Sequence, residues 1–347
     1  MRLSEEIDLG RSLKQVFGNK PDFTVQIEED RARQSATANA ILRRFFAAGE
    51  SERRELMILA DEVGLGKTYV ALAVAVSILD AIRRGEAPDD LPSNKPVVLV
   101  LTPTNDALFN KWMREAEAFK TDCARNKNGF EWLQIRSPLD NSSRSGNLIN
   151  MSCQMRGASR SRPMLIIAKQ SALGAGLHDR DSWRRRGLAA LFGHFRTPTE
   201  TRRYWCRKGR VFDNFGIPEL TELLDLRSSG HLWDDTNFPD LERAFFRALE
   251  LDPELVARAA SALTRNDESI LSRLLDDFVR RALAGRWSLL PLVIIDEVHG
   301  LKNEHVQSRR HCKAIFNGRF GRSLGLSARP SHLPQAGFLM LLNCPTG

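Results

Sequence analysis

One segment limits the possible folds of this chain more than any other: residues 61–68, which read DEVGLGKT. They lie between a short apolar run, residues 56–60, and an amphipathic stretch that begins at Tyr69. An apolar run followed by glycines and then by a helical pattern predicts a strand, a sharp turn and a helix. In such a turn several backbone N–H groups point at one spot, which the positive end of the helix also faces. The segment therefore predicts an anion site of the phosphate-binding type.

The side chains that follow the glycines suit a nucleoside triphosphate. Lys67 would reach the β- and γ-phosphates, and the Thr68 hydroxyl would join the coordination sphere of Mg²⁺. The residues predicted to contact the nucleotide here are Gly64, Leu65, Gly66, Lys67 and Thr68. An ordinary glycine turn is the alternative for this segment taken alone, because the general phosphate-loop pattern has a glycine at the position of Asp61.

A second segment supplies two adjacent carboxylates. Residues 289–295 form an uninterrupted apolar run, and Asp296 and Glu297 follow it directly. Such a run predicts a strand buried on both faces, and α/β folds place their chemistry at the carboxyl ends of parallel strands. Asp296 is therefore predicted to hold Mg²⁺, and Glu297 to be the base that polarises an attacking water. A solvated turn after a core strand is the alternative interpretation.

Further apolar runs alternate with helical patterns along the chain. Strands are expected at residues 96–101 and 164–168 and within 319–327. Asn105 or Asp106 is expected to cap a helix after the first of these strands. The alternation predicts an α/β fold with a mainly parallel sheet and helices on both faces.

Composition is compatible with a polyanionic partner, since 51 Lys and Arg outnumber 43 Asp and Glu, a formal net charge of +8. Residues 183–186 and 202–208 interleave aromatic rings with cations, as surfaces that bind nucleic acid do, although solvated basic faces explain them at least as well. The five cysteines have no Cys-x-x-Cys spacing, so the sequence indicates neither a zinc site nor a disulfide framework. Without a signal segment or a run long enough to cross a bilayer, a cytoplasmic protein with no membrane partner is expected.

In this order, the segments resemble the N-terminal ATP-binding lobe of superfamily 2 helicases and translocases. The Swi/Snf-type branch of DNA-dependent ATPases is the most similar, because an acidic pair replaces the leading glycine of its phosphate loop, as Asp61 and Glu62 do here. The matching segments are 61–68, 101–103 with Trp112 and Phe119, 164–168 with Ser171, 296–303 and 325–330. Together they cover about residues 30–345.

The resemblance implies a RecA-like fold, ATP and Mg²⁺ as ligands, and a nucleic-acid partner, DNA or RNA, with double-stranded DNA the expected form. It assigns adenine recognition to Gln34, nucleic-acid contact to Thr102 and Pro103, and coupling between the nucleotide and the DNA to His299, Ser327 and Ala328. Arg329 departs from the family pattern, which usually has a threonine there. A bulky cation at this position is expected to impair that coupling.

Four parts are expected along the chain: an N-terminal extension at 1–30, the first part of the ATP-binding lobe at 31–173, a helical insertion at 174–285, and the second part of the lobe at 286–347. The family's second lobe, which closes the ATP site and supplies arginine fingers, is expected to be absent. We therefore expect binding of Mg·ATP with slow hydrolysis unless a separate chain supplies that lobe.

Two other functions are compatible with parts of the sequence. One is a non-enzyme, either a degenerate fragment or an ATP-gated module that binds nucleic acid or a partner protein. The other is a metabolic kinase with a phosphate loop, which the residues after the acidic pair disfavour, because such an enzyme has little reason to carry DEVH followed by Leu-Lys-Asn.

Overall fold

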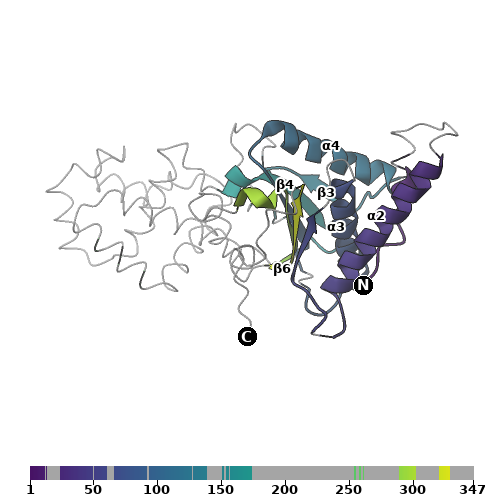
Figure 1. The fold of residues 1–347 in the computed structure, drawn as a ribbon. Coiled ribbons are helices and arrows are strands. Elements are labelled where there is room, and N and C mark those ends of the chain that lie inside the picture. The colour runs from purple at the N-terminus through teal and green to yellow at the C-terminus, as the bar shows by residue number, and fades with distance from the viewer. Residues whose placement is uncertain are drawn as a thin grey trace. The chain divides into compact units, whose positions relative to one another are not determined.

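The structure of the chain is a computed structural model (Figure 1). It describes residues 1–11, 13, 24–49, 51–60, 66–91, 94–126, 128–138, 151, 154–155, 157–173, 254, 258, 261, 289–301 and 320–328. The chain divides into two compact units, one made of residues 1–146, 154–173 and 287–347 and the other of 147–153 and 174–286. Every helix and strand given below belongs to the first unit. The helices predicted for residues 174–285 lie outside the described residues.

Within the described residues, six strands form one sheet in which every neighbouring pair is parallel. Their spatial order is β1 (Leu56–Ala60), β6 (Phe320–Ser327), β5 (Leu290–Ile295), β2 (Val97–Thr102), β4 (Met164–Lys169) and β3 (Gln134–Arg136). The central strands β2 and β5 are buried along their whole length, which explains their continuous apolar sequences. The predicted α/β class with a parallel sheet is confirmed.

Three long helices, α2 (Thr24–Phe45), α3 (Lys67–Arg84) and α4 (Asp106–Asp122), accompany the sheet (Figure 1). Their apolar residues form one core cluster with alternate residues of the strands, among them Val100 and Ile294. The intervening residues, such as Leu99 and Val293, are buried as well. Both faces of the sheet are therefore covered, but the long helices of the described part of the chain pack on one face.

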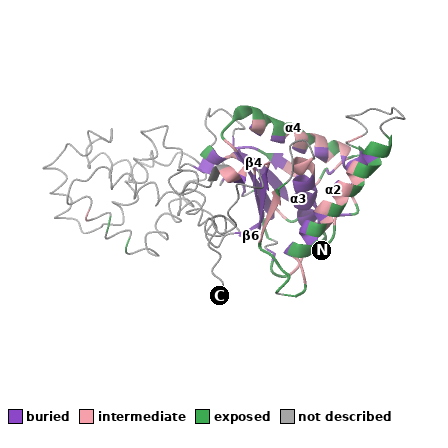
Figure 2. Cartoon of the chain, in the orientation of Figure 1, coloured by how far each residue is buried: buried purple, intermediate pink, exposed green. Residues whose placement is uncertain are grey.

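The helix α3 is the centre of this core. All residues from 70 to 82 are buried, as Figure 2 shows by its purple colour. A helix buried on all sides needs an apolar sequence all round, which explains its run of Val, Ala, Leu and Ile. Its two buried polar side chains have partners, because Ser77 Oγ accepts the Ser4 N–H at 2.9 Å and Asp80 Oδ2 accepts the Ser4 hydroxyl at 2.7 Å.

The first residues of the chain pack against the same core. Ile7 forms an isolated antiparallel bridge with Ala124, and both residues are buried. The helix α2 begins at Thr24. Its first turns are polar, and Ile27 is the one buried residue in them. Parts of the predicted N-terminal extension, residues 1–30, thus belong to the core.

Candidate functional site

The strand register brings the two predicted segments to one edge of the sheet. β1 ends at Ala60, which pairs with Ser327 of β6, and Ile295 of β5 pairs with Gly325 of the same strand. Asp296 and Glu297 follow Ile295 directly, so they lie at the same edge of the sheet as the end of β1. Because β6 separates β1 from β5, their ends lie two strand spacings apart, or about 10 Å. This distance suits two groups that bind opposite sides of one triphosphate.

The N-terminus of α3 lies at this edge and has no side-chain cap. Gly66, the N-cap residue, is left-handed with φ 79° and, as a glycine, supplies no side-chain cap. The first turn also carries no acidic residue, and it contains Lys67 and Thr68, both half-buried. Backbone N–H groups at a helix N-terminus attract anions, so this end of α3 is suited to phosphate oxygens.

The predicted adenine-reading residue, Gln34, lies beside this turn. It is buried in α2, with 5% of its surface exposed. Its side-chain amide is so close to Gly66 that a Cβ on this glycine would come within 2.3 Å of Gln34 Nε2. The structure thus brings Gln34 and the N-terminus of α3 together, although they are far apart in sequence.

Asp296, the first residue after β5, has two hydrogen-bond donors on its carboxylate. The indole of Trp112, on α4, donates from Nε1 to Oδ2 at 2.8 Å. The backbone N–H of Glu297 donates to Oδ1 at 2.9 Å. Gln170 donates to the backbone carbonyl of Asp296 at 3.4 Å, which ties the turn to the residue that follows β4.

Burial raises the pKa of the Asp296 carboxyl above its ordinary value. The hydrogen bond from Trp112 lowers this pKa, and the neighbouring charge of Glu297 raises it. The net upward shift means that the ionised carboxylate is held in the protein at a cost in free energy. Perturbed carboxyl groups of this kind are frequent at functional sites.

Glu297 has the only positive φ among the non-glycine residues of the described part of the chain, at 50°. Such a backbone conformation is uncommon for a glutamate and marks a functional turn more often than a random one. Its Oε2 atom is buried and accepts no hydrogen bond from the described residues. His299 Nδ1 lies 3.0 Å from this atom, close enough for an ion pair with a protonated imidazole.

His299 connects this acid to the end of β6. It lies in the short helix η4 (Val298–Leu301), and its Nδ1 is 3.3 Å from Ser327 Oγ. The predicted coupling residues His299 and Ser327 are therefore in contact with each other, and His299 is in contact with the predicted base, Glu297. Ala328 follows β6 directly and is half-buried.

The predicted nucleic-acid residues Thr102 and Pro103 lie at the end of β2, at the same edge of the sheet. Thr102 is fully buried, and its hydroxyl donates to the backbone carbonyls of Pro103 at 3.2 Å and Ala168 at 3.5 Å. Pro103 is half-buried. Of this pair, only Pro103 therefore offers surface to a partner.

Other predicted residues lie outside the described part of the chain. They are residues 61–65 of the phosphate loop with Gly64 and Leu65, residues 302–303 of the acidic motif, Arg329 and Pro330, and the basic segments 183–186 and 202–208.

The described residues fit Mg²⁺ bound to a triphosphate. Mg²⁺ prefers hard oxygen ligands, which the Asp296 carboxylate and the Thr68 hydroxyl supply. Glu297 is adjacent to Asp296 and its side chain is partly exposed, so its carboxylate can act beside a metal held by Asp296. Among the described residues, no group of three His, Cys, Asp or Glu side chains is placed to hold a metal by itself, so phosphate and water oxygens would complete the coordination.

Sequence reasoning missed the contact between Trp112 and Asp296. The two residues are 184 positions apart, and the apolar stripe of α4 indicates only that Trp112 is buried. A buried indole N–H nevertheless needs a hydrogen-bond acceptor. This rule alone could have predicted that a polar group lies beside Trp112.

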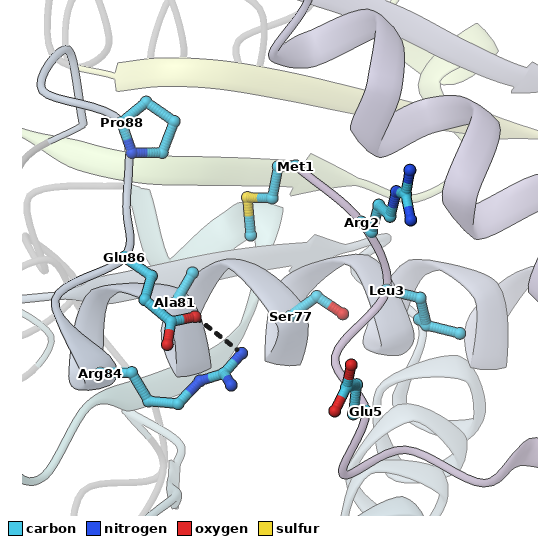
Figure 3. Close-up of a pocket in the computed structure, with 9 residues that line it drawn as sticks. All are labelled: Met1, Arg2, Leu3, Glu5, Ser77, Ala81, Arg84, Glu86 and Pro88. Carbon is cyan, nitrogen blue, oxygen red and sulfur yellow. Dashed lines mark ion pairs between the residues drawn. The ribbon is translucent and has the colours of Figure 1, made fainter.

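A cavity of about 440 Å³ lies elsewhere, between the first residues of the chain and the C-terminal half of α3 (Figure 3). Ser77, Ala81 and Arg84 line it from α3, and Arg84 forms an ion pair with Glu86 at 3.2 Å. The α-helical rise places Ala81 roughly 20 Å along the helix from Lys67. This cavity is thus separate from the predicted nucleotide site.

No protein-family model matches the sequence, and no curated protein matches it either. In the described part of the chain, no helix is long and apolar enough to span a membrane.

Proposed function

We propose that residues 31–173 and 286–347 form a RecA-like ATP-binding lobe that binds Mg·ATP at the carboxyl edge of its parallel sheet. Lys67 and the N–H groups of the α3 N-terminus bind the phosphates, and Thr68 and Asp296 bind Mg²⁺. Gln34 contacts the nucleotide beside Gly66. Mg²⁺, when bound, neutralises charge on the phosphate oxygens.

One observation carries this proposal: the acidic pair follows β5 and the turn that leads into α3 follows β1, and these two strands end at the same edge of one sheet, on either side of β6. A phosphate site needs fixed positive dipoles, and a magnesium site needs a carboxylate within reach of the same phosphates. Every strand of a parallel sheet ends at this edge, so the specific feature is that only β6, among the described strands, separates the two turns. The shifted pKa of Asp296 gives the proposal independent support.

The reaction class we propose is ATP hydrolysis coupled to nucleic acid, as in DNA-dependent ATPases of the helicase and translocase type. Glu297 orients and deprotonates the attacking water, and His299 lies within 3.0 Å of its carboxylate. Charge that develops on the transferred phosphoryl group requires cations beyond Lys67. A lobe that offers Lys67 as its cation is therefore expected to hydrolyse ATP slowly, and arginines from a second lobe would increase the rate.

A second function, an ATP-gated binding module without turnover, is favoured by Thr102. The resemblance gives this residue a contact with the nucleic-acid backbone, but its hydroxyl is buried and donates to backbone carbonyls of the protein. A lobe of this kind would bind Mg·ATP and present a surface to a partner without DNA-stimulated hydrolysis.

Phosphate release tests the two functions against each other. The ATPase proposal predicts slow release by the purified chain, an increase when double-stranded DNA is added, and no release by Lys67→Ala or Glu297→Gln. The binding module would be established instead by two results together. The wild type would bind ATP, and its phosphate release would not exceed that of Glu297→Gln, with or without DNA. Absence of ATP binding would refute both.

A further inference from the structure

We infer that Trp112 is a positioning residue for the magnesium-binding acid: its indole N–H fixes the carboxylate of Asp296 in the orientation that receives the metal. This inference rests on the proposed function and extends it to a residue outside the phosphate loop and the acidic pair. It starts from the 2.8 Å hydrogen bond between Trp112 Nε1 and Asp296 Oδ2.

The donor is held rigidly. Trp112 is 2% exposed and belongs to the core cluster that joins α4 to the sheet. The first turn of α4 is fixed by Asn105, whose side chain accepts the N–H of Ala107 at 2.7 Å, and by an ion pair between Asp106 and Lys169 at the end of β4. The indole N–H therefore has one direction available to it, toward Asp296.

The acceptor keeps lone pairs that a metal could use. An ionised carboxylate has about four acceptor positions, two on each oxygen. In the described part of the chain two donors reach it, the indole on Oδ2 and the Glu297 N–H on Oδ1. These two bonds define the plane of the carboxylate and leave one lone pair on each oxygen. A carboxylate that is oriented but not saturated is the usual condition of a metal ligand with hydrogen-bonded outer partners.

Removal of the indole N–H should raise the Mg²⁺ concentration that ATP binding requires. Outer partners of metal ligands contribute about 10–100-fold to metal affinity, so Trp112→Phe is expected to shift the Mg²⁺ midpoint by about 10-fold. Equilibrium dialysis of radiolabelled ATP over a series of Mg²⁺ concentrations measures this midpoint. ATP binding in the presence of EDTA should be the same for wild type and variant, since the phosphates then meet Lys67 without the metal.

Trp132→Phe is the matched control. The Trp132 indole also donates to a carboxylate, Glu6 Oε2 at 3.4 Å. Glu6 is one of the first residues of the chain and is not part of the proposed magnesium site. This variant loses the same type of bond and should leave the Mg²⁺ midpoint unchanged. A second control is the Asp296→Ala background, in which Trp112→Phe should have no further effect on the midpoint if the indole acts through Asp296.

Replacing Trp112 by benzothienylalanine protects the test against a folding defect, because sulfur takes the place of the N–H and the ring keeps its shape. The same rise in the Mg²⁺ midpoint supports the inference. A midpoint equal to that of the wild type, in a variant that binds ATP, overturns the role of Trp112 and leaves the proposed function intact. A wild-type chain that binds no ATP at any Mg²⁺ concentration overturns the proposed function, and this inference with it.

Discussion

The side chain of Gln34 fills the space that a Cβ at position 66 would occupy. A Cβ on Gly66 would lie 2.3 Å from Gln34 Nε2 and 3.1 Å from its Cδ, both inside van der Waals contact. Gly66 also has φ 79°, a conformation that side chains of L-residues rarely adopt. Glycine is thus required at this position by the backbone and by a neighbour from another helix.

Substitution of Gly66 by alanine should therefore destabilise the chain and weaken ATP binding. The left-handed conformation costs a non-glycine residue roughly 1–2 kcal/mol, and the displaced amide of Gln34 adds to this cost. Chemical denaturation measures the first effect and nucleotide titration the second. In the Gln34→Ala background the clash is absent, so Gly66→Ala should reduce the free energy of unfolding by a smaller amount. Some loss should remain there because of the left-handed backbone. An alanine variant as stable as the wild type would contradict the described turn.

Asp80 offers a test of the fold that is independent of the site. Its carboxylate is fully buried, accepts the Ser4 hydroxyl at 2.7 Å and pairs with Arg83 at 2.6 Å. Because Arg83 is partly exposed and can be hydrated, we expect Asp80→Asn to lower the free energy of unfolding by about 1–3 kcal/mol. ATP affinity should not change, since Asp80 lies roughly 20 Å along α3 from Lys67. A loss of ATP binding without a loss of stability would be inconsistent with this placement.

Glu297→Gln should separate binding from hydrolysis. The amide keeps the size of the side chain but cannot take a proton from water, so hydrolysis is expected to fall by about 10²–10⁴-fold while ATP affinity is retained. Single-turnover phosphate release and a binding titration on the same preparation measure the two quantities. Equal hydrolysis by wild type and variant would remove Glu297 from the chemistry.

The raised pKa of Asp296 predicts how Mg²⁺ binding depends on pH. Only the ionised carboxylate binds the metal, so affinity is full above the pKa of the folded protein and is lost as the pH falls through it. Because burial raises this pKa, the loss begins at a higher pH than it would for an exposed aspartate. Dialysis at decreasing pH, with circular dichroism to confirm folding, measures the profile.

ATP itself takes up protons in the same range, and Asp296→Asn controls for this effect. The difference between wild type and variant isolates the contribution of the carboxyl group. A difference that stays constant down to the pH at which the chain unfolds would show that Asp296 does not bind the metal.

The strands β1, β2, β4 and β5 were predictable because each is almost entirely an apolar run. The expected strands at 96–101 and 164–168 correspond to Val97–Thr102 and Met164–Lys169, within about one residue. Asn105 is the cap of α4, one of the two residues predicted for this role. β3 was missed, since its three residues, Gln134–Arg136, form no apolar run, and a neighbour in the sheet rather than local sequence makes them a strand.

The predicted site required information that local patterns do not contain. Periodicity places Asp296 at the end of a strand, but the position of β6 between β1 and β5 is a property of the whole sheet. The same holds for Gln34 beside Gly66, which depends on how α2 packs on α3. Buried polar groups were the remaining clue, because Trp112 and Gln34 both needed partners that the sequence could not identify.

Calorimetric titration of the purified chain with Mg·ATP tests the central claim most directly. If the α3 N-terminus and the acidic pair bind one triphosphate, the wild type should bind one equivalent of Mg·ATP. The Lys67→Ala variant should lose about 10–100-fold in affinity, the effect of removing a hydrogen bond to a charged group. No heat of binding in the wild type over a range of temperatures, or the same affinity in Lys67→Ala, would contradict the account.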